Sequence, residues 1–306
     1  MIQKIKPYWE QVKDNTWCIV TGYARIPVYR LGDGRAIMID SGWDYDGENI
    51  IELLESENLR LVAVLTSHAH PDHAGNHWLL REHFGAELYM TAYASATCQD
   101  PVTMFNMLHA RTGFRGIRDR MKNLFAADHI IPWEDGELSV EGATFRYLKT
   151  HGHCSEHLAF ITPDNVAYLG DAILSKEIMA TARMHYCNCL EVYLESVEKI
   201  GRLNCDKYII AHNGVVDDIR ETVQVCIDTV AQRAQVLRYL AKTPATVDEL
   251  AHRFLLHTKA DLSSVRSVHG VQYNTLAYVS YMYDKKMLKL IFEDGFSRYV
   301  STDSGE

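Results

Sequence analysis

The spacing of apolar residues changes between strand-like and helix-like patterns over the first two thirds of the chain. Short apolar segments between glycine-containing turns predict strands at 17–21, 26–30, 36–40, 61–65, 87–90, 145–148, 158–161, 166–169 and 207–211. Helical spacing predicts helices at 47–57, 77–84 and 192–200. This mixture of elements predicts a layered α+β domain over residues 1–216.

Residues 217–306 have a different pattern and predict a separate small domain. A long helical pattern at 221–242 is followed by Thr246-Val247-Asp248-Glu249, a capping box that predicts a second helix. Asn274 is the expected cap of a third helix, and two strands flank Asp294-Gly295, a strong hairpin signal. Three helices followed by a hairpin predict a winged-helix-like domain.

The composition is that of an ordinary globular protein, with 47% apolar and 23% charged residues among 306. The net charge of −9 argues against a broadly cationic nucleic-acid binder. No apolar run reaches the length of a membrane span, and the N-terminus lacks a signal-peptide pattern. The seven cysteines have no disulfide-framework spacing, so we expect reduced thiols and a cytoplasmic location.

The histidines carry the strongest chemical signal. Ser67-His68-Ala69-His70-Pro71-Asp72-His73 places three histidines and a carboxylate directly after the buried strand 61–65. His153, Asp171 and His212 each follow another predicted strand, and each has a glycine within two residues. Imidazole and carboxylate are ligands that Zn, Fe and Mn accept, so this repeated placement predicts a metal site.

The motif His-x-His-x-Asp-His, followed by a distant His, Asp and His, resembles the metallo-β-lactamase superfamily over residues 15–215. The resemblance implies a four-layered αββα sandwich with a dinuclear metal site. By the same resemblance, one metal would bind His68, His70 and His153, the second would bind Asp72, His73 and His212, and Asp171 would bridge both.

The segment 150–157 is similar to that of glyoxalase II and of β-lactamase-like hydrolases with a C-terminal winged-helix-like domain, except that His151 stands where proline is usual. The resemblance implies two divalent ions, zinc first and Fe or Mn as alternatives. A hydroxide between two such ions can attack a small ester, thioester or lactone. Asp72 is the expected catalytic residue, which orients this hydroxide and carries a proton.

Candidates for substrate contact lie beside these motifs. His157 follows His153 by four residues and predicts either substrate contact or support of a ligand, and Tyr186 is a candidate for the pocket entrance. Arg115 and Arg118 belong to a basic segment, Arg111–Lys122, inside a predicted helical insertion at 95–129. This segment either attracts an anionic small-molecule substrate or forms a solvated helix face.

Other functions remain open on sequence alone. The same two-metal chemistry serves a nuclease or phosphodiesterase, and iron on this fold serves a sulfur dioxygenase. A further alternative is a binding protein that senses a ligand in this pocket without catalysing a reaction on it. The C-terminal segment has 11 basic and 12 acidic residues, so we expect it to pack against the catalytic body or a second subunit in a homodimer rather than to bind nucleic acid.

Overall fold

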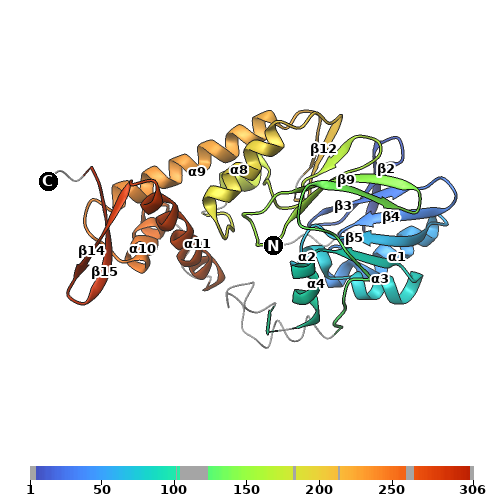
Figure 1. The fold of residues 1–306 in the computed structure, drawn as a ribbon, viewed down its shortest axis with the longest axis horizontal. Coiled ribbons are helices and arrows are strands. Elements are labelled where there is room, and N and C mark those ends of the chain that lie inside the picture. The colour runs from blue at the N-terminus through green and yellow to red at the C-terminus, as the bar shows by residue number, and fades with distance from the viewer. Residues whose placement is uncertain are drawn as a thin grey trace.

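The computed structural model has two β-sheets packed face to face, with helices on both outer faces (Figure 1). It describes residues 5–100, 102–103, 123–181, 184–212, 214–259 and 265–303. The first sheet follows chain order: β1 (Tyr8–Lys13), β2 (Thr16–Val20), β3 (Arg25–Arg30), β4 (Arg35–Ile39), β5 (Arg60–Leu65), β6 (Glu87–Met90) and β7 (His129–Ile130). Strands β1 to β4 are antiparallel, and β4 to β7 are parallel.

The second sheet has the spatial order β13 (Gly214–Val216), β12 (Lys207–Ile210), β11 (Val166–Tyr168), β10 (Leu158–Ile161), β9 (Ala143–Lys149) and β8 (Gly136–Val140). Its β11–β12 pair is parallel, and its other pairs are antiparallel. The carboxyl ends of β11 and β12 therefore lie at the same edge of the sheet.

Apolar side chains from the two inner faces form the central core. Ile37 and Ile39 of β4 belong to the same buried cluster as Phe145 of β9 and Phe160 of β10. Strand β9 alternates between buried and exposed positions because only one of its faces meets the first sheet. Strands β10 and β11 are buried along their whole length, in agreement with their continuous apolar sequences.

Helices α1 (Gly47–Ser56) and α3 (His77–Phe84) cover the first sheet, where Leu54 and Leu80 pack against its outer face. Helices α8 (Leu190–Gly201) and α9 (Arg220–Leu240) cover the second sheet, with Val197 and Val223 in the contact. The order helix, sheet, sheet, helix confirms the predicted αββα sandwich. Within the described ranges, no helix is both long enough and apolar enough to cross a bilayer.

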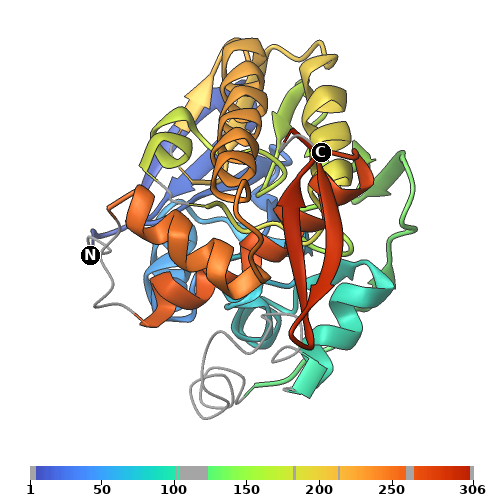
Figure 2. The ribbon, with the colours of Figure 1, turned by 90° about the vertical axis from the view of Figure 1, so that its left-hand side faces the viewer.

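The C-terminal segment continues from α9 into α10 (Val247–His257), α11 (Val265–Asp284) and the hairpin β14 (Leu288–Glu293) and β15 (Phe296–Ser301). It stands beside the sandwich, with the hairpin farthest from it (Figures 1 and 2). One apolar cluster runs from the second sheet through α8 and α9 into α10 and α11, so the segment packs against the body. The capping box and the hairpin are present as predicted. The winged-helix class and the boundary at residue 216 stay predictions.

Two details differ from the sequence analysis. Helix α11 begins at Val265, so Asn274 is not its cap. Asn274 is 2% exposed, and its side-chain oxygen accepts a hydrogen bond from the Cys187 backbone N–H at 3.3 Å. Four polar or short strands, β1, β7, β8 and β13, lacked a clear apolar pattern and were not predicted. The insertion begins within α4 (Ala92–Gln99), but most of its residues lie outside the described ranges.

Candidate metal centre

The loops that follow β5, β9, β11 and β12 meet at one edge of the sandwich. The loop after β5 carries His68 to His73 and leads into the short helix α2 (Pro71–Ala74). The other three loops carry His153, Asp171 and His212. Parallel neighbours in each sheet end on the same side, and this brings residues from distant parts of the chain together.

The first group of metal-binding side chains contains His68, His70, His153 and Asp171. The distance from His68 Nε2 to His70 Nδ1 is 3.0 Å, and that from His70 Nδ1 to His153 Nε2 is 2.9 Å. His153 Nε2 lies 3.2 Å from Asp171 Oδ2. Ligand nitrogens around a tetrahedral zinc ion are about 3.3 Å apart, since each lies roughly 2.0–2.1 Å from the metal. The spacing of this group is close to that value.

The second group contains Asp72, His73 and His212. His212 Nε2 lies 3.5 Å from Asp72 Oδ2 and 3.1 Å from Asp171 Oδ1. His73 Nε2 lies 3.5 Å from the same Asp171 oxygen. Asp171 therefore directs one carboxylate oxygen toward each group. The structure brings all seven predicted ligand residues together, and their role as ligands stays a prediction.

The donor atoms fit a divalent cation. Among the described residues, the buried atoms Nε2 of His73, Nε2 of His212 and Oδ1 of Asp171 make no hydrogen bond. A buried polar atom without a hydrogen bond is costly, and a cation is a partner that imidazole nitrogens and a carboxylate oxygen can share. The ring N–H of His212 is directed away, from Nδ1 to the Tyr23 carbonyl at 3.1 Å, so its Nε2 lone pair faces the group.

Asp40 lies behind the second group and orients His73. Its Oδ2 accepts hydrogen bonds from His73 Nδ1 at 2.8 Å, Ser67 Oγ at 2.6 Å and Tyr168 Oη at 2.7 Å. The Ser67 backbone N–H donates to Asp40 Oδ1 at 2.7 Å. With the His73 proton held on Nδ1, Nε2 presents its lone pair to Asp171 and its neighbours. Asp40 is thus a positioning residue for the site.

The sequence analysis missed Asp40, although a signal was present. Asp40 follows the apolar strand β4 and precedes Ser41-Gly42. His153, Asp171 and His212 were selected because each follows a strand and lies near a glycine, and Asp40 satisfies the same rule.

The charges of the cluster favour a cation. Burial and the neighbouring histidines lower the pKa of His68 well below its usual value, and burial has the same effect on His153, so both rings stay neutral as ligation requires. Burial opposes the ionisation of Asp171, but His212, His73 and His153 hold its pKa well below the usual range. Burial alone would lower the pKa of His73, but Asp171 and Asp40 raise it well above its usual value. The second group therefore attracts positive charge.

His157 supports the cluster from behind. It is fully buried, and its Nδ1 lies 2.9 Å from Thr150 Oγ1. Its Nε2 accepts a hydrogen bond from the Asp171 backbone N–H at 3.1 Å. Burial lowers the pKa of His157 to about 4, so the ring is neutral and able to accept this bond. The buried position favours support of a ligand over substrate contact, and the role of His157 stays a prediction.

Of the other predicted substrate residues, the structure describes Tyr186 but not the two arginines. Tyr186 is half-buried beside the first group, with ring centroids 5.3 Å from His70 and 4.9 Å from His153. Its role at the pocket entrance stays a prediction. Arg115 and Arg118 lie outside the described residues.

The loop that carries His153 is anchored to α8 through a close approach at Gly152. The φ of Gly152 is +118°, and a Cβ atom there would lie 2.4 Å from the Tyr193 Cα. Its carbonyl accepts hydrogen bonds from the backbone N–H groups of Asn188 and Cys189 at 2.8 and 3.2 Å. Only glycine fits this conformation and space. The neighbouring His151, which replaces the usual proline, leaves this anchoring intact.

The layers of the fold and the paired His/Asp groups at one edge define the class of αββα proteins with a two-part metal-binding site. A sequence model described as the metallo-beta-lactamase superfamily matches residues 25–212. The chain therefore belongs to the metallo-beta-lactamase superfamily.

Several named proteins are similar to this chain in sequence. Lactamase-like protein nscB of Aspergillus fumigatus is 25% identical over 237 residues, which cover 76% of this chain and 58% of that protein. Hydroxyacylglutathione hydrolase GloC of Haemophilus influenzae is 29% identical, over 58% of this chain and 80% of its own. An atrochrysone carboxyl ACP thioesterase of A. fumigatus is 33% identical, over 32% of this chain and 30% of its own.

The similarity in fold extends over nearly the whole chain. The crystal structure of a beta-lactamase domain protein from Burkholderia ambifaria has a TM-score of 0.75 and 18% sequence identity. The match covers 96% of this chain and 93% of that one. It therefore includes the C-terminal segment as well as the sandwich.

Proposed function

We propose that this protein is a metal-dependent hydrolase that binds two divalent ions, most favourably zinc, and cleaves a small ester, thioester or lactone. The observation that carries the proposal is the position of Asp171. One of its oxygens lies 3.2 Å from His153, and the other lies 3.1 Å from His212. A carboxylate so placed can join two ions held by the two groups.

In this proposal, His68, His70 and His153 hold one ion, and Asp72, His73 and His212 hold the other, with Asp171 shared. Two bound ions would lower the pKa of a water molecule between them toward 7 and polarise a substrate carbonyl. The relatives named as a thioesterase and a hydroxyacylglutathione hydrolase support a carbonyl substrate.

Side chains of the protein would position the attacking water and transfer protons during hydrolysis. The Asp72 side chain is 14% exposed, compared with 8% for Asp171, so Asp72 is the carboxylate more open to solvent. It would orient the attacking water and carry a proton to the leaving group. Ser67 and Cys154 take no nucleophilic role in this proposal. Ser67 Oγ donates a hydrogen bond to Asp40, and burial raises the pKa of the Cys154 thiol, which disfavours the thiolate.

Elemental analysis of the purified protein tests the metal site directly. We expect about two equivalents of divalent metal per chain and a loss of metal in His68→Ala. The matched control is His252→Ala, which removes an exposed imidazole on α10 and should leave the metal content unchanged. A folded wild-type protein that takes up no metal on reconstitution would contradict the proposal.

Activity is then measured with a panel of small esters, thioesters and lactones. We expect Asp72→Asn to lose at least about 100-fold in kcat/KM, because a positioned acid or base typically contributes 10²–10⁴-fold. His68→Ala should also lose activity, because it removes a proposed metal ligand. Circular dichroism confirms that the variants are folded. Hydrolysis that persists at the wild-type rate in both variants would exclude this site as the catalytic centre.

A further inference from the structure

Residues 184–189 form a loop that lies between the metal centre and the C-terminal segment and leads into α8. We call it the bridging loop. It carries Tyr186, whose ring lies beside those of His70 and His153. Half of its residues are buried, so many of its polar groups need hydrogen-bond partners within the protein. These partners come from two sides, the loop of His153 and the helices of the C-terminal segment.

On the side of the metal centre, the bridging loop is bonded to the backbone next to His153. The carbonyl of Gly152, the residue before His153, accepts hydrogen bonds from the backbone N–H groups of Asn188 and Cys189 at 2.8 and 3.2 Å. Cys187 Sγ lies 3.4 Å from the same oxygen. Three consecutive residues of the bridging loop therefore meet at one peptide group, and a shift of the loop would move the backbone that carries His153.

On the other side, two buried polar residues of α9 and α11 hold the bridging loop. Asn274 is 2% exposed, and its Oδ1 accepts a hydrogen bond from the Cys187 backbone N–H at 3.3 Å. Arg233, also buried, donates from Nη1 to His185 Nδ1 at 3.1 Å. Burial and the charge of Arg233 lower the pKa of His185 to about 3, so its ring is neutral and can accept this bond. A satisfied buried network of this kind favours one position of the loop over others.

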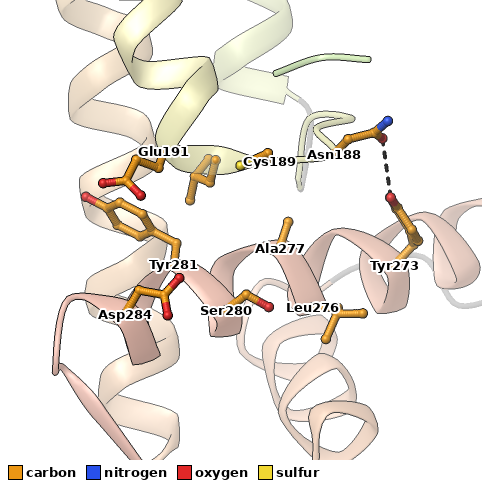
Figure 3. Close-up of a pocket in the computed structure, with 10 residues that line it drawn as sticks. Asn188, Cys189, Glu191, Tyr273, Leu276, Ala277, Ser280, Tyr281 and Asp284 are labelled. Atoms are coloured by element: carbon orange, nitrogen blue, oxygen red, sulfur yellow. Dashed lines mark hydrogen bonds between the residues drawn. The ribbon is translucent and has the colours of Figure 1, made fainter. Parts of the chain in front are cut away.

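A pair of tyrosines makes a third contact between α11 and the bridging loop. Tyr273 stacks on Tyr186, with ring centroids 6.0 Å apart and an interplanar angle of 19°. Its Oη donates a hydrogen bond to Asn188 Oδ1 at 3.3 Å (Figure 3). Two adjacent residues of α11, Tyr273 and Asn274, thus contact three consecutive residues of the loop, 186 to 188. Helix α11 therefore reaches the first ligand group through the loop.

We infer that Asn274, together with Arg233 and Tyr273, is a positioning residue for the metal centre. The C-terminal segment holds the bridging loop, and the loop fixes Tyr186 and the backbone beside His153. This inference rests on the proposed function and adds a role for the C-terminal segment in it. The second ligand group is oriented from within the sandwich, by Asp40 and the Tyr23 carbonyl. Loss of the Asn274 contact should therefore affect the two ions unequally.

Metal affinity tests this role by competition with a chelator. We expect Asn274→Ala to bind one of its two metal equivalents about 3–30-fold more weakly, the usual range for a residue that acts through others, and the second nearly as in the wild type. Asn274→Asp keeps an oxygen acceptor for the Cys187 N–H and should retain most of the affinity. Leu250→Ala is the control, because it removes a buried side chain of α10 from the same apolar cluster. It should destabilise the protein without weakening either ion.

Thiol labelling of the metal-free protein reports on the loop independently of metal and catalysis. Cys187 is 1% exposed, and Cys226 of α9, at 0%, is an internal reference for global unfolding. We expect Asn274→Ala to raise the rate of N-ethylmaleimide modification at Cys187 relative to Cys226 by about threefold or more, because the loop opens locally. Peptide mass spectrometry separates the two sites. Leu250→Ala should leave this ratio unchanged.

A second variant covers the case in which Asn274→Ala does not fold. Tyr273 is half-buried, and Tyr273→Leu removes both the stacked ring and the hydrogen bond to Asn188. It should weaken the same metal equivalent by a few-fold. Wild-type affinity for both equivalents in either folded variant would overturn the inference, whatever the labelling shows, and leave the proposed function standing. A wild-type protein that takes up no metal would instead overturn the proposed function and the inference with it.

Discussion

Asp40→Asn tests how the protein prepares the second ligand group. Asp40 is 1% exposed and accepts hydrogen bonds from the Ser67 backbone and side chain, His73 and Tyr168. Its φ is +62°, a left-handed conformation that asparagine tolerates well. The substitution therefore keeps the backbone and changes only the hydrogen-bonding capacity of the side chain.

The expected magnitude follows from the hydrogen bonds to one oxygen. Oδ2 accepts from Ser67, His73 and Tyr168, and an amide NH₂ in its place would face three donors. The hydroxyls can rotate, but His73 must move its proton from Nδ1 to Nε2, where the proton blocks ligation. Loss of a partner that orients a metal ligand typically weakens metal affinity 10–100-fold, or about 1.4–2.7 kcal/mol. Loss of hydrogen bonds to a carboxylate destabilises the metal-free protein by a further ~1.5–3 kcal/mol.

Competition with a chelator measures this effect. We expect one of the two metal equivalents to bind 10–100-fold more weakly in Asp40→Asn and the other to be nearly unchanged. Asp33→Asn is the matched control, because the Asp33 side chain is 52% exposed and lies on the surface. Urea unfolding of the metal-free variants gives the stability difference. Unchanged affinity for both equivalents in a folded Asp40→Asn protein would refute the positioning role of Asp40.

Three further predictions concern other parts of the molecule. Gly152→Ala should destabilise the protein by about 2–4 kcal/mol in urea unfolding, because the added Cβ would meet the Tyr193 backbone and the φ is positive; a melting curve like that of the wild type would contradict the close approach. Removing metal with a chelator should lower the melting temperature, since a ligand at 100 times its Kd stabilises the native state by about 2.7 kcal/mol; no shift would argue against a structural contribution from bound metal. Thr246→Ala should cost about 1 kcal/mol through loss of the capping box without changing metal content, and a loss of metal in this variant would link α10 to the site.

The sequence predicted well those elements whose pattern is local. Helix α3 and strand β10 were predicted at their observed bounds, and the hairpin was predicted around Asp294-Gly295, because each has its periodicity or turn residues within its own segment. The start of α11 was predicted incorrectly because the residue taken as its cap makes a long-range contact instead. Asn274 has a cap residue's chemistry, but its partner is the Cys187 backbone N–H, 87 residues away in the chain.

The sequence by itself determined which chemical groups are available and that they follow strand ends. The His68–His73 motif and the later His153, Asp171 and His212 stood out without any structure. Only the tertiary structure decided how they combine, with Asp171 between the two groups and Asp40 behind His73. The physical reason is that periodicity and turns are encoded within a few residues, whereas convergence depends on strand register and on how the two sheets stack.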